Sequence, residues 1–90
     1  MPTKKLAELE PEFEDVEHGG KFCRALTFTC PACDGHAIMV PFAGASPFDS
    51  GAMWRLQGAE DISTATLIPS IHVRSGCGFH GFVTNGEVSW

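Results

Sequence analysis

Two pairs of residues in this sequence have the types and the spacing of metal ligands. Cys30 and Cys33 lie in the segment CPACDG, and Cys77 and His80 lie in CGFHG. Two intervening residues let both side chains of a tight turn reach one tetrahedral ion, and three cysteines with one histidine are a common structural zinc set. The sequence therefore predicts a Zn²⁺ site formed by Cys30, Cys33, Cys77 and His80.

Other residues compete for a place in this set. His36 follows Cys33 closely enough to replace His80 as a ligand. Cys23 is a further candidate, although its apolar strand favours a buried thiol. Cys30 and Cys33 could instead form a redox pair, but such a pair belongs at the start of a helix, and no helix is evident after it.

The predicted ligand set favours a structural metal over a catalytic one. Four protein ligands close the coordination sphere, whereas a catalytic zinc keeps an open position beside a general acid or base. The motif H-E-x-x-H of metalloproteases and the H-x-E motif of zinc nucleobase deaminases are both absent from the chain. We predict no catalytic residue, and a metalloenzyme with an open site at His36 or His80 stays an alternative.

The segments around the first pair have the composition of β-strands. Residues 21–29 and 36–42 are rich in aromatic and β-branched side chains, and the Cys-Pro turn lies between them. These two segments therefore predict a hairpin that carries Cys30 and Cys33 at its tip.

The C-terminal half predicts further short strands. Residues 53–57 and 64–73 are strand candidates, and Pro69 indicates an edge or a bulge in the second of them. Asn85-Gly86 predicts a type I′ turn in a terminal hairpin, because both positions of that turn need positive φ. We expect a mostly β fold: a small, zinc-ribbon-like antiparallel sheet of about six short strands with no long helix.

The charge is concentrated at the N-terminus. The whole chain has a net charge of -5, and residues 1–17 hold six acidic residues against two lysines, a net charge of -4. We therefore expect residues 1–20 to form a flexible acidic arm and residues 21–90 to form the zinc-stabilised β domain. The remaining residues are close to neutral, so no basic surface for a nucleic-acid backbone is predicted.

Chain length and hydropathy limit the number of domains and the cellular location that we expect. Ninety residues make one small domain, and burial of apolar surface alone leaves such a domain only marginally stable. A bound metal ion that stabilises the fold is therefore favoured. No apolar run approaches the roughly 18 to 20 residues that span a bilayer, and the N-terminus lacks the hydrophobic region of a signal peptide. We expect a cytoplasmic protein with no membrane span.

The order of motifs FTCPAC, WRLQ, TLIPSI and CGFHGFVTNGEVSW resembles a family of small uncharacterised bacterial and phage proteins that are often labelled ammonia monooxygenases. The likeness covers roughly residues 26–90, and its most specific parts are the Pro-Ser-Ile stretch and the closing Cys-x-x-His block. The resemblance implies a zinc-binding β domain with ligands at the two pairs above. Some relatives are similar to components encoded beside bacterial ubiquitin-like conjugation genes, which implies a protein-binding accessory.

The leading functional hypothesis is an adaptor or accessory factor that binds an unidentified protein partner and acts as a monomer or weak dimer. Its binding surface could include Phe48, Trp54, Arg55 and Arg74. The same aromatic and arginine side chains leave a nucleic-acid-binding zinc ribbon as an alternative, which the charge disfavours.

Overall fold

The computed structural model describes residues 2–33, 35–73 and 77–90. The fold is mostly β, as the sequence predicts, and the described residues form two antiparallel sheets. The elements are β1 (Thr3–Lys5), the 3-10 helix η1 (Leu6–Leu9), β2 (Glu12–His18), β3 (Lys21–Thr29), β4 (Ala37–Gly44), β5 (Arg55–Gln57), β6 (Thr66–His72), β7 (His80–Thr84) and β8 (Glu87–Ser89).

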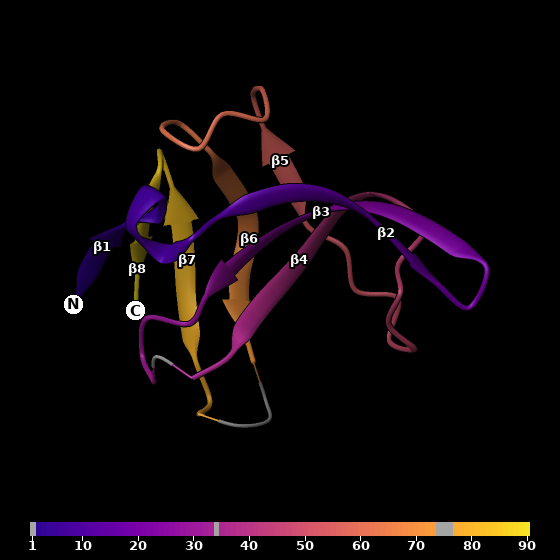
Figure 1. Ribbon diagram of the computed structural model, residues 1–90, viewed down its shortest axis with the longest axis horizontal. Helices are drawn as coiled ribbons and strands as arrows, with labels where there is room; N and C mark the ends of the chain where they lie inside the picture. Colours follow the sequence, from indigo (N-terminus) through magenta and orange to yellow (C-terminus); the bar gives the residue numbers. More distant parts are fainter. Residues whose placement is uncertain (1, 34, 74–76) are drawn as a thin grey trace.

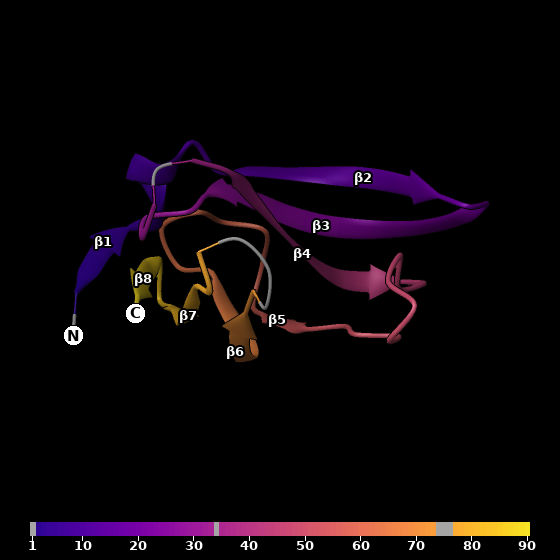
Figure 2. The same cartoon turned by 90° about the horizontal axis from the view of Figure 1, so that it is seen from below.

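The two sheets form two layers. The five-stranded sheet has the order β1-β8-β7-β6-β5, and the three-stranded sheet has the order β2-β3-β4. Figure 1 shows the strands of one sheet crossing those of the other, and Figure 2 shows the two layers from the side, with the β2–β3 hairpin projecting at one end. The chain ends lie together because β1 pairs with β8.

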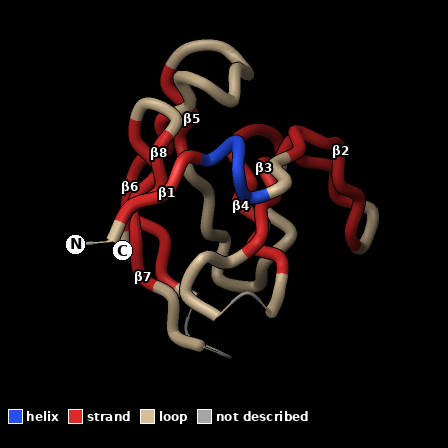
Figure 3. The backbone as a smooth tube through the Cα atoms, turned by 60° about the vertical axis from the view of Figure 1, so that its left-hand side comes forward, coloured by secondary structure: helices blue, strands red, loops and turns tan. Residues whose placement is uncertain are grey.

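The N-terminal segment is part of this domain. Residues expected to form a flexible arm supply β1, η1 and β2, and Leu6 and Leu9 of η1 are almost completely buried. The short helix is visible between β1 and β2 in Figure 3. The acidic side chains do not prevent this docking because β2 is an edge strand that keeps most of them exposed.

One hydrophobic core lies between the layers. It takes side chains from both sheets and from η1: Leu6, Leu9, Leu26, Phe28, Cys30, Ile38, Val40, Ala65, Leu67, Ile71, Phe79, Val83 and Val88. The alternation of buried and exposed residues along β7 is that of a strand with one face on the core and one face in solvent. The outer face of the five-stranded sheet is therefore accessible.

Two local predictions from the sequence are confirmed. Asn85 and Gly86, between β7 and β8, have φ values of 49° and 77°, as a type I′ turn requires. The β6–β7 ladder shifts register between Leu67 and Ile71, which places a bulge at Pro69.

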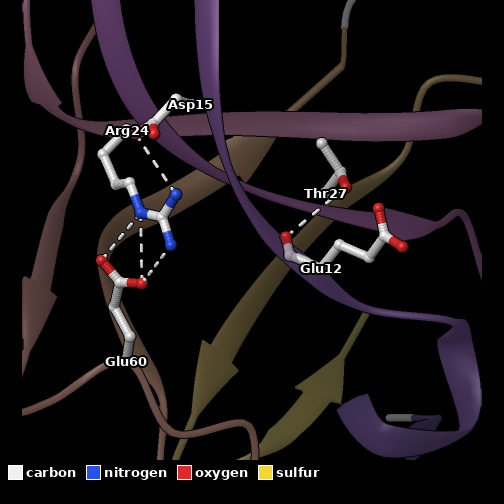
Figure 4. A network of polar contacts seen from close by, with 5 residues as sticks. All are labelled: Glu12, Asp15, Arg24, Thr27 and Glu60. Carbon is white, nitrogen blue, oxygen red and sulfur yellow. Dashed lines mark hydrogen bonds and ion pairs between the residues drawn. The ribbon is translucent and has the colours of Figure 1, made fainter.

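An exposed ionic contact joins the layers. Arg24 on β3 donates to the carboxylate of Glu60, in the β5–β6 connection, with Nη2 and Oε1 separated by 2.7 Å. Its Nη1 lies 3.2 Å from Asp15 Oδ1 on β2 (Figure 4). Among the described residues, no helix is long and apolar enough to cross a membrane.

Candidate functional site

Three thiols and one imidazole meet at the end of the molecule where β3 joins β4 and β6 joins β7. The ligand atoms of Cys30, Cys33, His36 and Cys77 all lie within 4.8 Å of one another. The Sγ atoms of Cys30 and Cys77 are 3.4 Å apart, and Cys33 Sγ lies 3.2 Å from His36 Nδ1. The end of β3 and the end of β6, from which these connections start, lie on the same side of the molecule in Figure 1.

Backbone hydrogen bonds hold these two connections in place. Cys30 N–H donates to the carbonyl of His36 at 2.9 Å and closes the β3–β4 turn. Val73 N–H donates to the carbonyl of Phe79 at 2.7 Å and closes the connection that carries Cys77. The ligands therefore come from turns whose strands are fixed by the two sheets.

The donor set and its spacing fit a bound metal ion. Zinc–sulfur bonds of about 2.3 Å in a tetrahedron place neighbouring ligand atoms about 3.5–3.8 Å apart, close to the separations in this cluster. His36 presents Nδ1 on the side of Cys33, while its Nε2 is buried without a hydrogen-bond partner among the described residues. A metal on Nδ1 would fix the ring proton at Nε2.

Two of the four ligands, Cys30 and Cys77, have pKa values shifted in opposite directions. Burial, and next the contact with Cys77, raises the pKa of the Cys30 thiol to about 11. Hydrogen bonds from Cys33 and Cys30 lower the pKa of Cys77. Cys77 is therefore the more readily formed thiolate of the two, and a metal must displace a proton from Cys30 to bind there.

The histidine of the cluster is His36, and His80 is not in it. The spacing predicted His80 as the fourth ligand with His36 as an alternative, but His80 stands on the exposed face of β7. Cys23, the other alternative ligand, is a buried thiol on β3 outside the cluster. Zinc-ribbon spacing did not distinguish the histidines, because both follow a cysteine by three residues.

His80 instead lies beside a serine on the neighbouring strand. Its Nε2 is 3.3 Å from the Oγ of Ser70, which stands in the β6 bulge. A nucleophile and a base within hydrogen-bond reach are the basic parts of a serine hydrolase, and such contacts are often loose before substrate binds. The sequence patterns did not identify Ser70 as a functional residue. The Pro-Ser-Ile stretch, one of the most specific parts of the family resemblance, contains it.

Aromatic rings flank this histidine. His72 on β6 stacks against His80 with ring centroids 4.8 Å apart, and the ring of Phe82, which is 44% exposed, has its centroid 6.4 Å from that of His80. Among the described residues, no carboxylate is hydrogen-bonded to His80. The two neighbouring rings therefore restrict its orientation in place of an acidic side chain.

A cleft of about 660 Å³ lies against β4, β6 and the β4–β5 connection, and its lining includes His36 of the cluster and His72, which stacks on His80. Two of the residues proposed as a binding surface, Phe48 and Trp54, line it. Arg55 is exposed on β5 outside the cleft. Arg74 lies outside the described residues.

One family model matches this chain, over residues 3–90, and its description is "bacterial ubiquitination-like system serine protease (BubE)". The match covers nearly the whole chain, including the N-terminal segment that the sequence resemblance left out. No curated protein and no solved structure matches the chain.

Proposed function

This chain belongs to the family of bacterial ubiquitination-like system serine proteases (BubE), and from that premise we propose that it is a serine hydrolase with Ser70 as nucleophile and His80 as general base. The observation that carries the proposal is the 3.3 Å separation of Ser70 Oγ and His80 Nε2 on the accessible face of the five-stranded sheet. The description of the family as serine proteases supports the same chemistry.

The chemistry uses the two side chains in sequence. Ser70 Oγ attacks the carbonyl carbon of the substrate while His80 Nε2 takes the hydroxyl proton, and the same nitrogen then gives that proton to the leaving group. A water molecule then attacks the acyl carbon while His80 Nε2 takes its proton, and Nε2 returns that proton to Ser70 Oγ as the acyl group leaves as a carboxylic acid. The rings of His72 and Phe82 hold the imidazole in the orientation that these transfers need.

The family description also supports a class of substrate. We propose that the cleaved acyl bond belongs to a protein of a ubiquitination-like system, as a peptide bond or as the bond that joins a modifier to its target. This role requires recognition of a protein partner, as the adaptor hypothesis did. That the chain binds a protein partner stays a prediction to be tested.

Zinc is the metal that the cysteine-rich cluster favours. Thiolate and imidazole ligands in a tetrahedral arrangement are typical of structural zinc. A zinc ion held by Cys30, Cys33, His36 and Cys77 would tie the β3–β4 turn to the β6–β7 turn. It would thereby fix β6 and β7, which carry Ser70 and His80, without taking part in the reaction.

A serine-directed probe tests the proposal directly. A fluorophosphonate should add covalently to Ser70, which intact-mass and peptide mass spectrometry will locate. The hydrolysis of p-nitrophenyl acetate should fall by about 100-fold or more in Ser70→Ala and in His80→Ala.

Ser89→Ala is the matched control. Ser89 pairs with Phe82 in the β7–β8 ladder of the same sheet, so its loss should leave labelling and hydrolysis unchanged. Labelling of Ser70→Ala at the wild-type rate would overturn the assignment of the nucleophile. An adaptor without hydrolase activity would then be the better description.

A further inference from the structure

The cleft beside the proposed catalytic pair is mainly apolar. Its wall is formed by side chains from both sheets and from the β4–β5 connection, chiefly Ile38, Met39, Phe48, Ala52, Trp54 and Ile71. His36 and His72 add imidazole rings at its margin. Clefts of this size with apolar walls and a few polar groups are typical ligand-binding sites.

Two residues of the cleft wall touch the two members of the catalytic pair. Trp54 Nε1 donates a hydrogen bond to the backbone carbonyl of Ser70 at 3.2 Å. His72 stacks on His80 at 4.8 Å between ring centroids. A group bound in the cleft therefore contacts two residues, Trp54 and His72, that touch the Ser70 backbone and the His80 ring.

At His72, the strand beside the cleft also has free backbone groups. Val73 N–H donates to the carbonyl of Phe79 just beyond the last β6–β7 pair, His72 with His80, so the N–H and C=O of His72 point away from β7. On that side β5 pairs only with Thr66–Ile68, and His72 has no backbone partner there among the described residues. An unpaired strand edge is a template for an extended peptide.

We infer that this cleft binds an extended segment of the substrate protein next to the cleaved bond. The segment adds as a strand at His72, and a large apolar side chain enters the cleft against Trp54 and Phe48. Backbone pairing supplies affinity, and the apolar pocket supplies specificity. This inference rests on the proposed hydrolase function, and it specifies the chemistry of the substrate near the scissile bond.

A substitution that fills the cleft tests the inference. Ala52→Trp places an indole in the wall of the cleft, whereas Ala45→Trp places the same side chain on an exposed position of the same connection, outside the cleft. The probe is a peptide digest of denatured bacterial proteins, with cleavage sites read by mass spectrometry. Wild-type protein and Ala45→Trp should prefer Leu, Met or Phe at one position within about three residues of the cut.

Ala52→Trp should lose that preference and cleave the preferred peptides at least tenfold more slowly, mainly through a higher KM. Ser70-dependent cleavage without an apolar preference would overturn the inference and leave the hydrolase function intact. So would an Ala52→Trp variant that cleaves as the wild type does.

Binding to an inactive variant separates the two proposals. Ser70→Ala protein should bind a pool of Leu- and Phe-containing peptides, with a change in tryptophan fluorescence, at least tenfold more tightly than a pool with Asp and Gly at the same positions. Adding Ala52→Trp should remove that difference. If Ser70→Ala binds selectively but the wild-type protein cleaves no peptide, the hydrolase function alone is overturned. Equal binding of both pools would overturn the proposed role of the cleft in substrate binding.

Discussion

The cysteine-rich cluster and the serine–histidine pair are built in opposite ways. The cluster takes its ligands from two turns, and two of its members, Cys30 and Cys33, are near neighbours in the chain. The pair takes one residue from each of two adjacent strands, and its geometry depends on their register and on a bulge. Local spacing therefore predicts the three cysteines of the cluster, whereas only the folded sheet defines the pair.

Burial also differs between the two regions. Cys30 has no exposed surface and packs in the core, so the cluster is part of what holds the layers together. His80 is exposed on the outer face, where its replacement removes no core contact. Changes in the first region should act on stability, and changes in the second should act on activity.

The largest effect is expected from Cys30→Ser. Loss of a buried thiolate should abolish tight metal binding, and because structural zinc contributes folding free energy of about 10 kcal/mol or more, the variant should lose its cooperative unfolding transition. Metal content by mass spectrometry and thermal unfolding by circular dichroism measure the two effects. A strong chelator should reproduce both in the wild-type protein.

Cys23→Ser is the control for that result. Cys23 is also a buried thiol, but it lies outside the cluster, so this variant should keep one metal ion per chain and lose only about 1 kcal/mol of stability. A Cys30→Ser protein that keeps its metal and unfolds like the wild type would remove the structural role of the cluster.

The two histidines sharpen the comparison further. His80→Ala should lower hydrolysis by about 10²- to 10⁴-fold and keep the metal, because general-base catalysis contributes on that scale. His36→Ala should release the metal and destabilise the fold. Metal analysis and unfolding of both variants separate the roles. Loss of metal from His80→Ala with retention in His36→Ala would restore the ligand set that the sequence predicted.

Much of the fold follows from local patterns, but the two histidine assignments do not. Cys33 and Cys77 are each followed by a histidine three residues later, so spacing alone is ambiguous. His80 belongs to a regular strand that pairs with β6, and this pairing directs its ring to the outer face beside Ser70. The choice depends on tertiary register, which the sequence pattern does not contain.

The N-terminal segment shows a second limit of local patterns. Its acidic residues and Pro11 favoured an arm, and a helix of this length is unstable by itself. The structure buries Leu6 and Leu9 against the other elements and pairs β1 with β8. Tertiary contacts therefore outweigh the local composition of this segment.

Leu6→Ala tests that packing and has a smaller expected effect. Leu6 has no exposed surface, so removing its side chain should destabilise the fold by about 2–5 kcal/mol through lost burial and a cavity. The metal ion should stay bound at temperatures below the new transition. Chemical denaturation measures the change, with the exposed Lys4→Ala as control. An effect below about 0.5 kcal/mol would mean that the segment does not support the core.

The smallest effect is expected from Arg24→Ala. The hydrogen bonds to Glu60, and next those to Asp15, raise the pKa of the Arg24 guanidinium above its usual range, and the partnership lowers the pKa of Glu60. These groups are solvent-exposed, however, and water and salt screen such pairs so that they contribute little to stability.

Removing the arginine should therefore change the thermal midpoint only slightly, and less at high salt than at low salt. Metal content and hydrolysis should stay at wild-type levels, because the contact joins β3 to the β5–β6 connection away from both candidate sites. Thermal unfolding at two salt concentrations, with Glu60→Gln as the matched variant, measures this. A large loss of activity in both variants would show that the relative position of the layers controls Ser70 and His80. The division of the molecule into a region that determines stability and a region that determines activity would then be wrong.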